Sequence, residues 1–149
     1  MSIPKLSYLN PQVCKVEILP TIDVNSIVVS DDGNSAAVNL KSSKVWFPIY
    51  VTPGKTSYDE EQLEDQGNTY FNQKLEFQYP GEDANSIAYL KDFNNSRSVI
   101  KFTYSSGLVK LIGTVLNPCT MQIHFSAEKG VRLVTLSRKS TTPAINYTP

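Results

Sequence analysis

The stretch SVIKFTYSSGLVKLIGTVLNPCTMQIHFSAEKGVRLVTLSR, from Ser98 to Arg138, decides the fold. Its segments 99–104 and 108–114 are rich in β-branched and apolar residues and flank a short turn with two serines and a glycine, which predicts a β-hairpin. Apolar and polar residues alternate over 121–126, and a further apolar segment covers 131–138. This third of the chain is therefore predicted to be one β-strand after another.

Upstream, the same signals predict five more strands, over residues 13–19, 24–30, 36–41, 45–52 and 71–79. The first two are expected to be neighbours. Pro48 lacks an amide hydrogen, so its strand is expected at a sheet edge or a bulge. A single short helix is predicted over 83–93. The fold class is mainly β: an antiparallel β-sandwich or small barrel with one short helix and extended N- and C-terminal arms.

The interval between residues 52 and 68 is polar, with five acidic residues between Asp59 and Asp65. It is predicted to be a solvated loop or a single helical turn, with an electrostatic contact to a partner as the alternative. The order of the acidic residues does not match a calcium-binding loop, which needs oxygen ligands at alternate positions and a glycine at the sixth.

Length and charge limit the possible classes of protein. A chain of 149 residues fits one domain, here an N-terminal arm (1–12), a β-sandwich domain (13–139) and a C-terminal arm (140–149). Fourteen basic residues balance fourteen acidic ones, which disfavours sequence-specific binding to nucleic acid. No segment has the roughly 20 apolar residues of a membrane span, and no export signal is recognisable, so synthesis and residence in the cytoplasm are expected, unless the protein leaves in a larger particle.

The sequence offers no complete catalytic or metal-binding motif. His124 is the only histidine, and it is expected on the solvent or subunit side of its strand. Gly54-Lys55-Thr56 resembles the end of a phosphate-binding loop, but Ile49 stands where the motif needs glycine. Cys14 and Cys119 are expected to be reduced core residues, with a disulfide between them as the alternative. We expect no enzyme activity, no cofactor and no metal.

Aromatic residues cluster in the middle third of the chain, among them Trp46, Tyr50, Phe71, Phe77 and Tyr79. Exposed aromatic faces could bind sugars, which gives an alternative function as a ligand- or carbohydrate-binding β module. The alternation over 71–79 favours core packing instead. A small hydrolase built around His124 is a third hypothesis.

The two ends share an extended, proline-bounded and sparsely charged character. Disordered tails usually lack large apolar side chains, whereas arms that dock on a neighbouring subunit use them. An equally weighted alternative is that both ends pack on their own domain. The candidate subunit-interface residues are Ile3, Leu6, Tyr8, Pro143, Ile145 and Tyr147.

The order of segments in the last third resembles a known family. Arg97–Tyr104, Ser106–Thr114, the Asn117-Pro118 turn, two closing strands and the ending Thr142–Tyr147 are similar to the ending of small structural proteins of tailed phages and prophages of Bacteroides-like gut bacteria, crAss-like phages among them. The resemblance implies a virion protein of the neck (head–tail connector) or tail that forms a ring with copies of itself. It implies portal, neck or tail proteins as further partners, and no catalytic residue.

Overall fold

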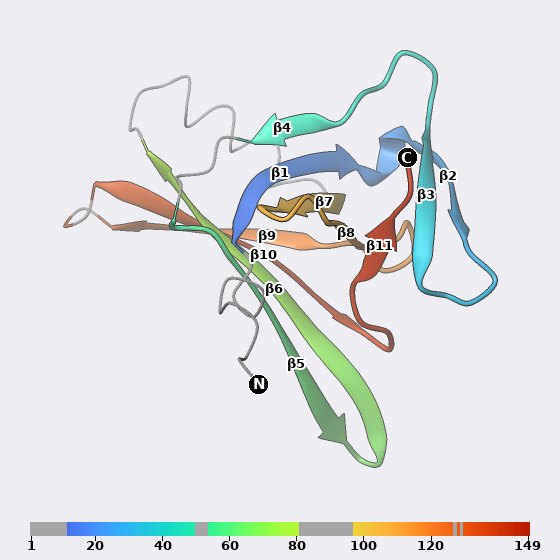
Figure 1. Ribbon diagram of the computed structural model, residues 1–149. Coiled ribbons are helices and arrows are strands. Elements are labelled where there is room, and N and C mark those ends of the chain that lie inside the picture. The colour runs from blue at the N-terminus through green and yellow to red at the C-terminus, as the bar shows by residue number, and fades with distance from the viewer. Residues whose placement is uncertain (1–11, 50–53, 81–96, 127, 129) are drawn as a thin grey trace, which may run out of the picture.

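The computed structural model describes residues 12–49, 54–80, 97–126, 128 and 130–149 (Figure 1). The described elements are strands, apart from one short 3-10 helix, Thr21–Asp23, which lies between the first two strands. The strands are β1 (Val13–Pro20), β2 (Val24–Val29), β3 (Ser35–Leu40), β4 (Phe47–Ile49), β5 (Ser57–Asp65), β6 (Asn68–Pro80), β7 (Ser98–Tyr104), β8 (Val109–Ile112), β9 (Thr120–Ser126), β10 (Val131–Ser140) and β11 (Ile145–Tyr147).

These strands form two sheets, which confirms the mainly β, sandwich-like class. One sheet has seven strands in the order β2-β3-β11-β8-β7-β1-β4, and the other has four in the order β5-β6-β10-β9. Neighbours are antiparallel except for β11 and β3, which run parallel. The hairpin predicted around residues 105–107 is confirmed, because β7 pairs with β8 from Ile100↔Ile112 to Thr103↔Val109.

Apolar side chains fill two clusters on opposite faces of the larger sheet. Consecutive residues of its central strands are buried in different clusters: Ile18, Ile100 and Ile112 belong to the first, and Leu19, Val99 and Leu111 to the second. Successive side chains of a strand point to opposite faces, so both faces of this sheet are covered. The first cluster also takes Leu75, Phe77, Val134 and Leu136 from the smaller sheet, and it is the sandwich core.

The acidic interval was predicted as a loop or helical turn, and this prediction is wrong. Ser57–Asp65 is strand β5, paired with β6 from Ser57↔Glu76 to Asp65↔Asn68. Gln66 and Gly67 connect the two strands, with φ of 52° and 83°, as a two-residue hairpin turn requires. Most β5 side chains are exposed, so the strand has little of the apolar alternation by which strands are recognised. In Figure 1 the hairpin of β5 and β6 extends well beyond the sandwich.

Other topological predictions have mixed outcomes. Pro48 lies in β4, which is the end strand of the larger sheet as expected. β1 and β2 are not neighbours: β1 pairs with β7 and β4, whereas β2 pairs with β3. The turn after Ser30 returns the chain directly along β2, and its Gly33 amide donates to the Ser30 carbonyl at 2.9 Å. The predicted helix over 83–93 lies outside the described residues. Within the described ranges, no helix has the length and apolar character needed to cross a bilayer.

Candidate binding cavity beside the C-terminal strand

The C-terminal segment is part of the chain's own sheet. β11 lies between β3 and β8, with Ile145 opposite Leu111 and Tyr147 opposite Ala36 (Figure 1). Ile145 and Tyr147 are half-buried against the second apolar cluster, and Pro143 is exposed. The segment predicted as a separate arm from residue 140 thus docks on its own domain in this single chain. The other interface candidates, Ile3, Leu6 and Tyr8, lie outside the described residues.

Lys101 joins β11 to the rest of the sheet through aromatic contacts. Its Nζ lies 4.6 Å from the ring centroid of Trp46 and 4.5 Å from that of Tyr147. The two rings meet edge to face with centroids 6.0 Å apart. The ammonium also forms an ion pair with Glu17, whose Oε1 lies 3.5 Å from Nζ. Trp46 therefore contacts both an ammonium and a tyrosine ring, which leaves it poorly suited as a sugar-stacking platform.

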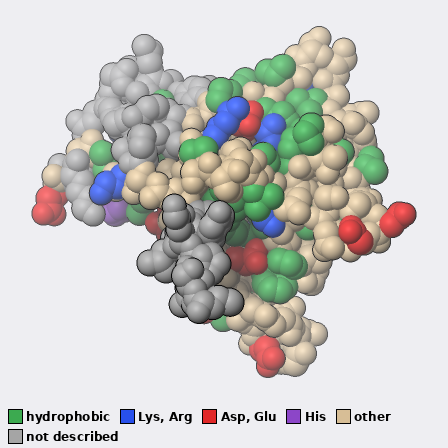
Figure 2. Space-filling view, in the orientation of Figure 1, with side chains coloured by type: hydrophobic (Ala, Val, Ile, Leu, Met, Phe, Trp, Pro, Cys, Tyr) green, Lys and Arg blue, Asp and Glu red, His purple; other side chains and the backbone are tan. Residues whose placement is uncertain are grey.

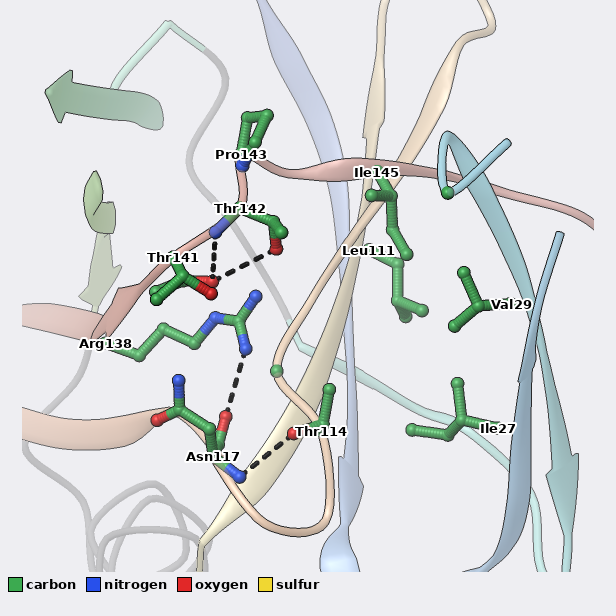
Figure 3. A pocket seen from close by; sticks show the side chains of 13 residues that line it. Ile27, Val29, Leu111, Thr114, Asn117, Arg138, Thr141, Thr142, Pro143 and Ile145 are labelled. Carbon is green, nitrogen blue, oxygen red and sulfur yellow. Dashed lines mark hydrogen bonds between the residues drawn. The ribbon is translucent and has the colours of Figure 1, made fainter. Parts of the chain in front are cut away.

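A cavity of about 350 Å³ lies between the C-terminal segment, β2 and the β8–β9 turn. Apolar side chains form one side and polar side chains the other (Figure 3). Its lining consists of Ile27, Val29, Gly33, Leu111, Gly113, Thr114, Asn117, Arg138, Ser140, Thr141, Thr142, Pro143 and Ile145. Arg138 is the only charged residue in this lining.

Two protein acceptors hold the Arg138 guanidinium. Its Nε donates to Oε1 of Gln73 at 2.6 Å. Its Nη1 donates to the backbone carbonyl of Asn117 at 3.1 Å (Figure 3). The Asn117 turn is itself fixed, because its amide donates to Oγ1 of Thr114 at 2.9 Å. Burial lowers the pKa of Arg138 from its ordinary value, which indicates that the group has lost part of its hydration.

Gln73 connects Arg138 to a second polar group. The Nε2 atom of this fully buried side chain donates to Oε1 of Glu60 at 3.2 Å and to the Thr142 carbonyl at 3.3 Å. The same Glu60 oxygen also accepts from the Tyr58 hydroxyl and from the Ala144 amide, both at 2.8 Å. Burial and the Glu60 hydrogen bond raise the pKa of Tyr58 far above its ordinary value. The network thus ties the C-terminal segment to β5, β6 and β10.

Sequence reasoning missed both central residues of this network. Gln73 is the one polar residue at the inward-facing odd positions of 71–79. A polar side chain on a buried face needs a hydrogen-bond partner. The position of Gln73 in the alternation was therefore a sign, readable from the sequence, that it takes part in a polar network. Arg138 gave no comparable signal, because its partners lie 65 residues upstream and 21 residues upstream.

The remaining candidate residues lie apart from the cavity. His124 is exposed, on the side of β9 opposite buried Met121, as expected. Both cysteines are free, and Cys119 is buried as predicted, but Cys14 is exposed and not a core residue. Burial raises the pKa of Cys119 to about 12. In the part of the chain that the structure describes, no three His, Cys, Asp or Glu residues are grouped so as to hold a metal ion.

Comparison with models of protein families, with curated proteins and with solved structures finds no match for this chain.

Proposed function

We propose that the chain is a non-enzymatic structural subunit of a tailed-phage virion, which assembles as a ring at the head–tail junction or in the tail. The resemblance of the last third supports the class of protein. The observation that carries the ring is the projecting β5–β6 hairpin, whose outer strand leaves most of its side chains in water. The end of this hairpin is two-stranded, because β10 pairs with β6 only as far as Phe71. A two-stranded ribbon is marginally stable by itself, so a neighbouring subunit is a natural support for it.

Charge is distributed so that copies can bind head to tail. β5 carries five of the fourteen acidic residues and no basic residue, which leaves fourteen basic against nine acidic residues in the rest of the chain. Acidic side chains are visible at the far end of the hairpin, and basic side chains over the body of the sandwich (Figure 2). A contact between two different surfaces of identical subunits closes into a ring when the rotation allows it, and complementary charge favours the correct register.

The edge of the larger sheet offers a second contact. β2 is its end strand, and Val28 and Val29 are 57% and 50% exposed. Exposed apolar strands at a sheet edge pair readily with another chain. Leu116, at the β8–β9 turn, is 98% exposed and adds an apolar contact point.

The test is the oligomeric state of the purified protein, measured by light scattering and negative-stain electron microscopy. The wild-type chain is expected to form closed rings, and the double variant Glu61→Lys/Glu64→Lys to stay monomeric, because it removes most of the negative charge of β5. The matched control is Asp31→Lys/Glu128→Lys, which changes the net charge equally at exposed sites outside the hairpin and should still assemble. A wild-type chain that is monomeric at every protein and salt concentration would contradict the proposal. Capsid, portal or tail genes beside its own would support the virion assignment.

A second candidate function, a ligand- or carbohydrate-binding β module, is favoured by the cavity beside Arg138 rather than by Trp46. If sugars bind at Trp46, its fluorescence should change across a panel of glycans. The contacts of Lys101 and Tyr147 with that ring lead us to expect no change.

A further inference from the structure

Arg138 is a half-buried cation without a direct carboxylate partner among the residues that the structure describes. The ion pairs of the described residues join Lys15 and Lys101 to Glu17, Lys44 to Asp23 and Lys74 to Glu76, and none includes Arg138. Removing a charge from water is unfavourable unless hydrogen bonds and an opposite charge compensate it. Two hydrogen bonds to neutral oxygens compensate Arg138 only in part.

The guanidinium keeps donors available on the cavity side. It has five N–H donors, of which one on Nε and one on Nη1 have acceptors, while Nη2 makes no hydrogen bond with the described residues. In Figure 3 the Nη end of Arg138 points into the cavity. Nη1 and Nη2 lie at the same end of the planar group, so together they can donate to both oxygens of one carboxylate.

Glu60 is the nearest acid in the network, and it does not take this place. Gln73 stands between Glu60 and Arg138, and the Glu60 Oε1 atom already accepts hydrogen bonds from Tyr58, Gln73 and Ala144. Glu60 therefore offsets the charge of Arg138 at a distance, from the side of Gln73, and leaves the cavity-facing donors without an anion.

The opposite side of the cavity is apolar. Ile27, Val29, Leu111 and Ile145 lie across from Arg138, whereas the hydroxyls of Thr114 and Thr141 lie on its side (Figure 3). A single cation matches a singly charged anion better than a phosphate, which carries more charge. Because binding sites combine apolar walls with a few placed polar groups, we infer that this cavity binds a small carboxylic acid with a short branched aliphatic chain. The carboxylate lies on Arg138 and the chain on the isoleucines and leucine. This inference goes beyond ring assembly and does not depend on it.

The experiment is a titration of the ¹⁵N-labelled protein with 4-methylpentanoate, followed by amide chemical shifts. Binding should move the signals of Gly113, Thr142 and Ile145 with saturation in the millimolar range. The uncharged 4-methylpentanamide has nearly the same shape and should bind at least tenfold more weakly. Equal binding of acid and amide, no saturable shift, or tighter binding of inorganic phosphate would each overturn the inference.

Two variants locate the site. Arg138→Gln removes the charge and should weaken binding of 4-methylpentanoate at least tenfold. Because Arg138 also supports the fold, Val29→Asp provides an independent test: Val29 is half-exposed at the cavity wall, and a carboxylate there repels the ligand while the Arg138 contacts stay intact. Lys139→Gln, an exposed neighbour outside the lining, is the control and should bind like wild type. Unchanged affinity in Val29→Asp would contradict the assignment.

Discussion

Arg138 and Gln73 face each other across the β10–β6 ladder, and the Nε of Arg138 donates to Oε1 of Gln73 at 2.6 Å. The pair joins the middle of the smaller sheet to the C-terminal segment, because Gln73 also donates to the Thr142 carbonyl. A buried amide is suited to this position: its oxygen accepts from the cation while its nitrogen donates to Glu60 and to the backbone.

Gln73→Leu should destabilise the protein. The apolar side chain leaves Arg138 Nε without its acceptor and removes one donor from Glu60, and a partly buried charged group that loses its partner costs about 2–3 kcal/mol of unfolding free energy. Urea unfolding followed by the fluorescence of the single Trp46 measures this loss.

Gln62→Leu, at an exposed position of β5, is the control and should change stability by only about 0.5 kcal/mol. The double variant Gln73→Leu/Arg138→Leu should recover part of the loss, since replacing both partners by apolar groups avoids the unpaired charge. A Gln73→Leu protein as stable as wild type would show that the network contributes nothing to the fold.

Tyr147→Ala should release β11. The change removes the ring that contacts both Lys101 and Trp46, and truncating a half-buried aromatic side chain costs about 2–3 kcal/mol. Trp46 should become more solvated, so its emission maximum should shift to longer wavelength together with the loss of stability.

Tyr147→Phe keeps the aromatic ring and is the matched control. Its emission maximum should stay at the wild-type wavelength and its stability within about 1 kcal/mol of wild type. If Tyr147→Ala leaves the emission of Trp46 unchanged, β11 does not hold the tryptophan in place.

Strands with one buried and one exposed face were predictable from sequence. The strand expected over 71–79 became part of β6, with Leu75 and Phe77 fully buried on the predicted face. β5 pairs with β6 but was missed. Most of its side chains are exposed, so its sequence lacks the alternation of apolar and polar residues that indicates a strand.

β11 and the cavity could not be predicted for a different reason. β11 has three residues, and its partners lie in β3 and β8, far away in the sequence. Such a short segment docks on its own domain only if the fold leaves a place for a strand between β3 and β8. That place is created by the whole sheet and is not visible in the local sequence. The cavity likewise joins residues from β2, β8, β10 and the C-terminal segment, which no local pattern connects.

Gly113→Ala should be more damaging than Gly67→Ala. Both glycines have positive φ, 99° and 83°, where a side chain costs about 1–2 kcal/mol. A Cβ at Gly113 would also lie 3.1 Å from the Ser98 carbonyl oxygen and 3.2 Å from Val99 Cα, whereas nothing lies within 4 Å at Gly67. Thermal or urea unfolding should show that the free energy of unfolding of Gly113→Ala is at least about 1 kcal/mol lower than that of Gly67→Ala. Equal losses of stability would mean that the backbone around Ser98 shifts to make room for the added Cβ.

The two cysteines should differ in reactivity. Cys14 is exposed, whereas Cys119 is buried and its pKa is raised to about 12. Because the thiolate is the reactive form, a thiol reagent at pH 8 should modify one cysteine in the native protein and two in denaturant. Cys14→Ser should remove the native reaction. Two rapidly reacting thiols in the native wild type would contradict the burial of Cys119, and none in denaturant would indicate a disulfide.

Stability should fall in alkaline solution, and Tyr58 should contribute to the fall. Burial and the Glu60 hydrogen bond raise the pKa of Tyr58 in the folded state, so this phenol stays protonated after its unfolded counterpart begins to ionise near the ordinary tyrosine pKa of 10.0. A raised folded-state pKa stabilises the protein fully below the unfolded pKa, and this stabilisation is lost as the pH rises above it. Tyr58→Phe loses the hydrogen bond but cannot ionise, so its deficit relative to wild type should shrink between pH 9 and about pH 11.5. Urea unfolding at a series of pH values measures this difference, and a deficit that stays constant or grows over the range would show that Tyr58 ionises equally in both states.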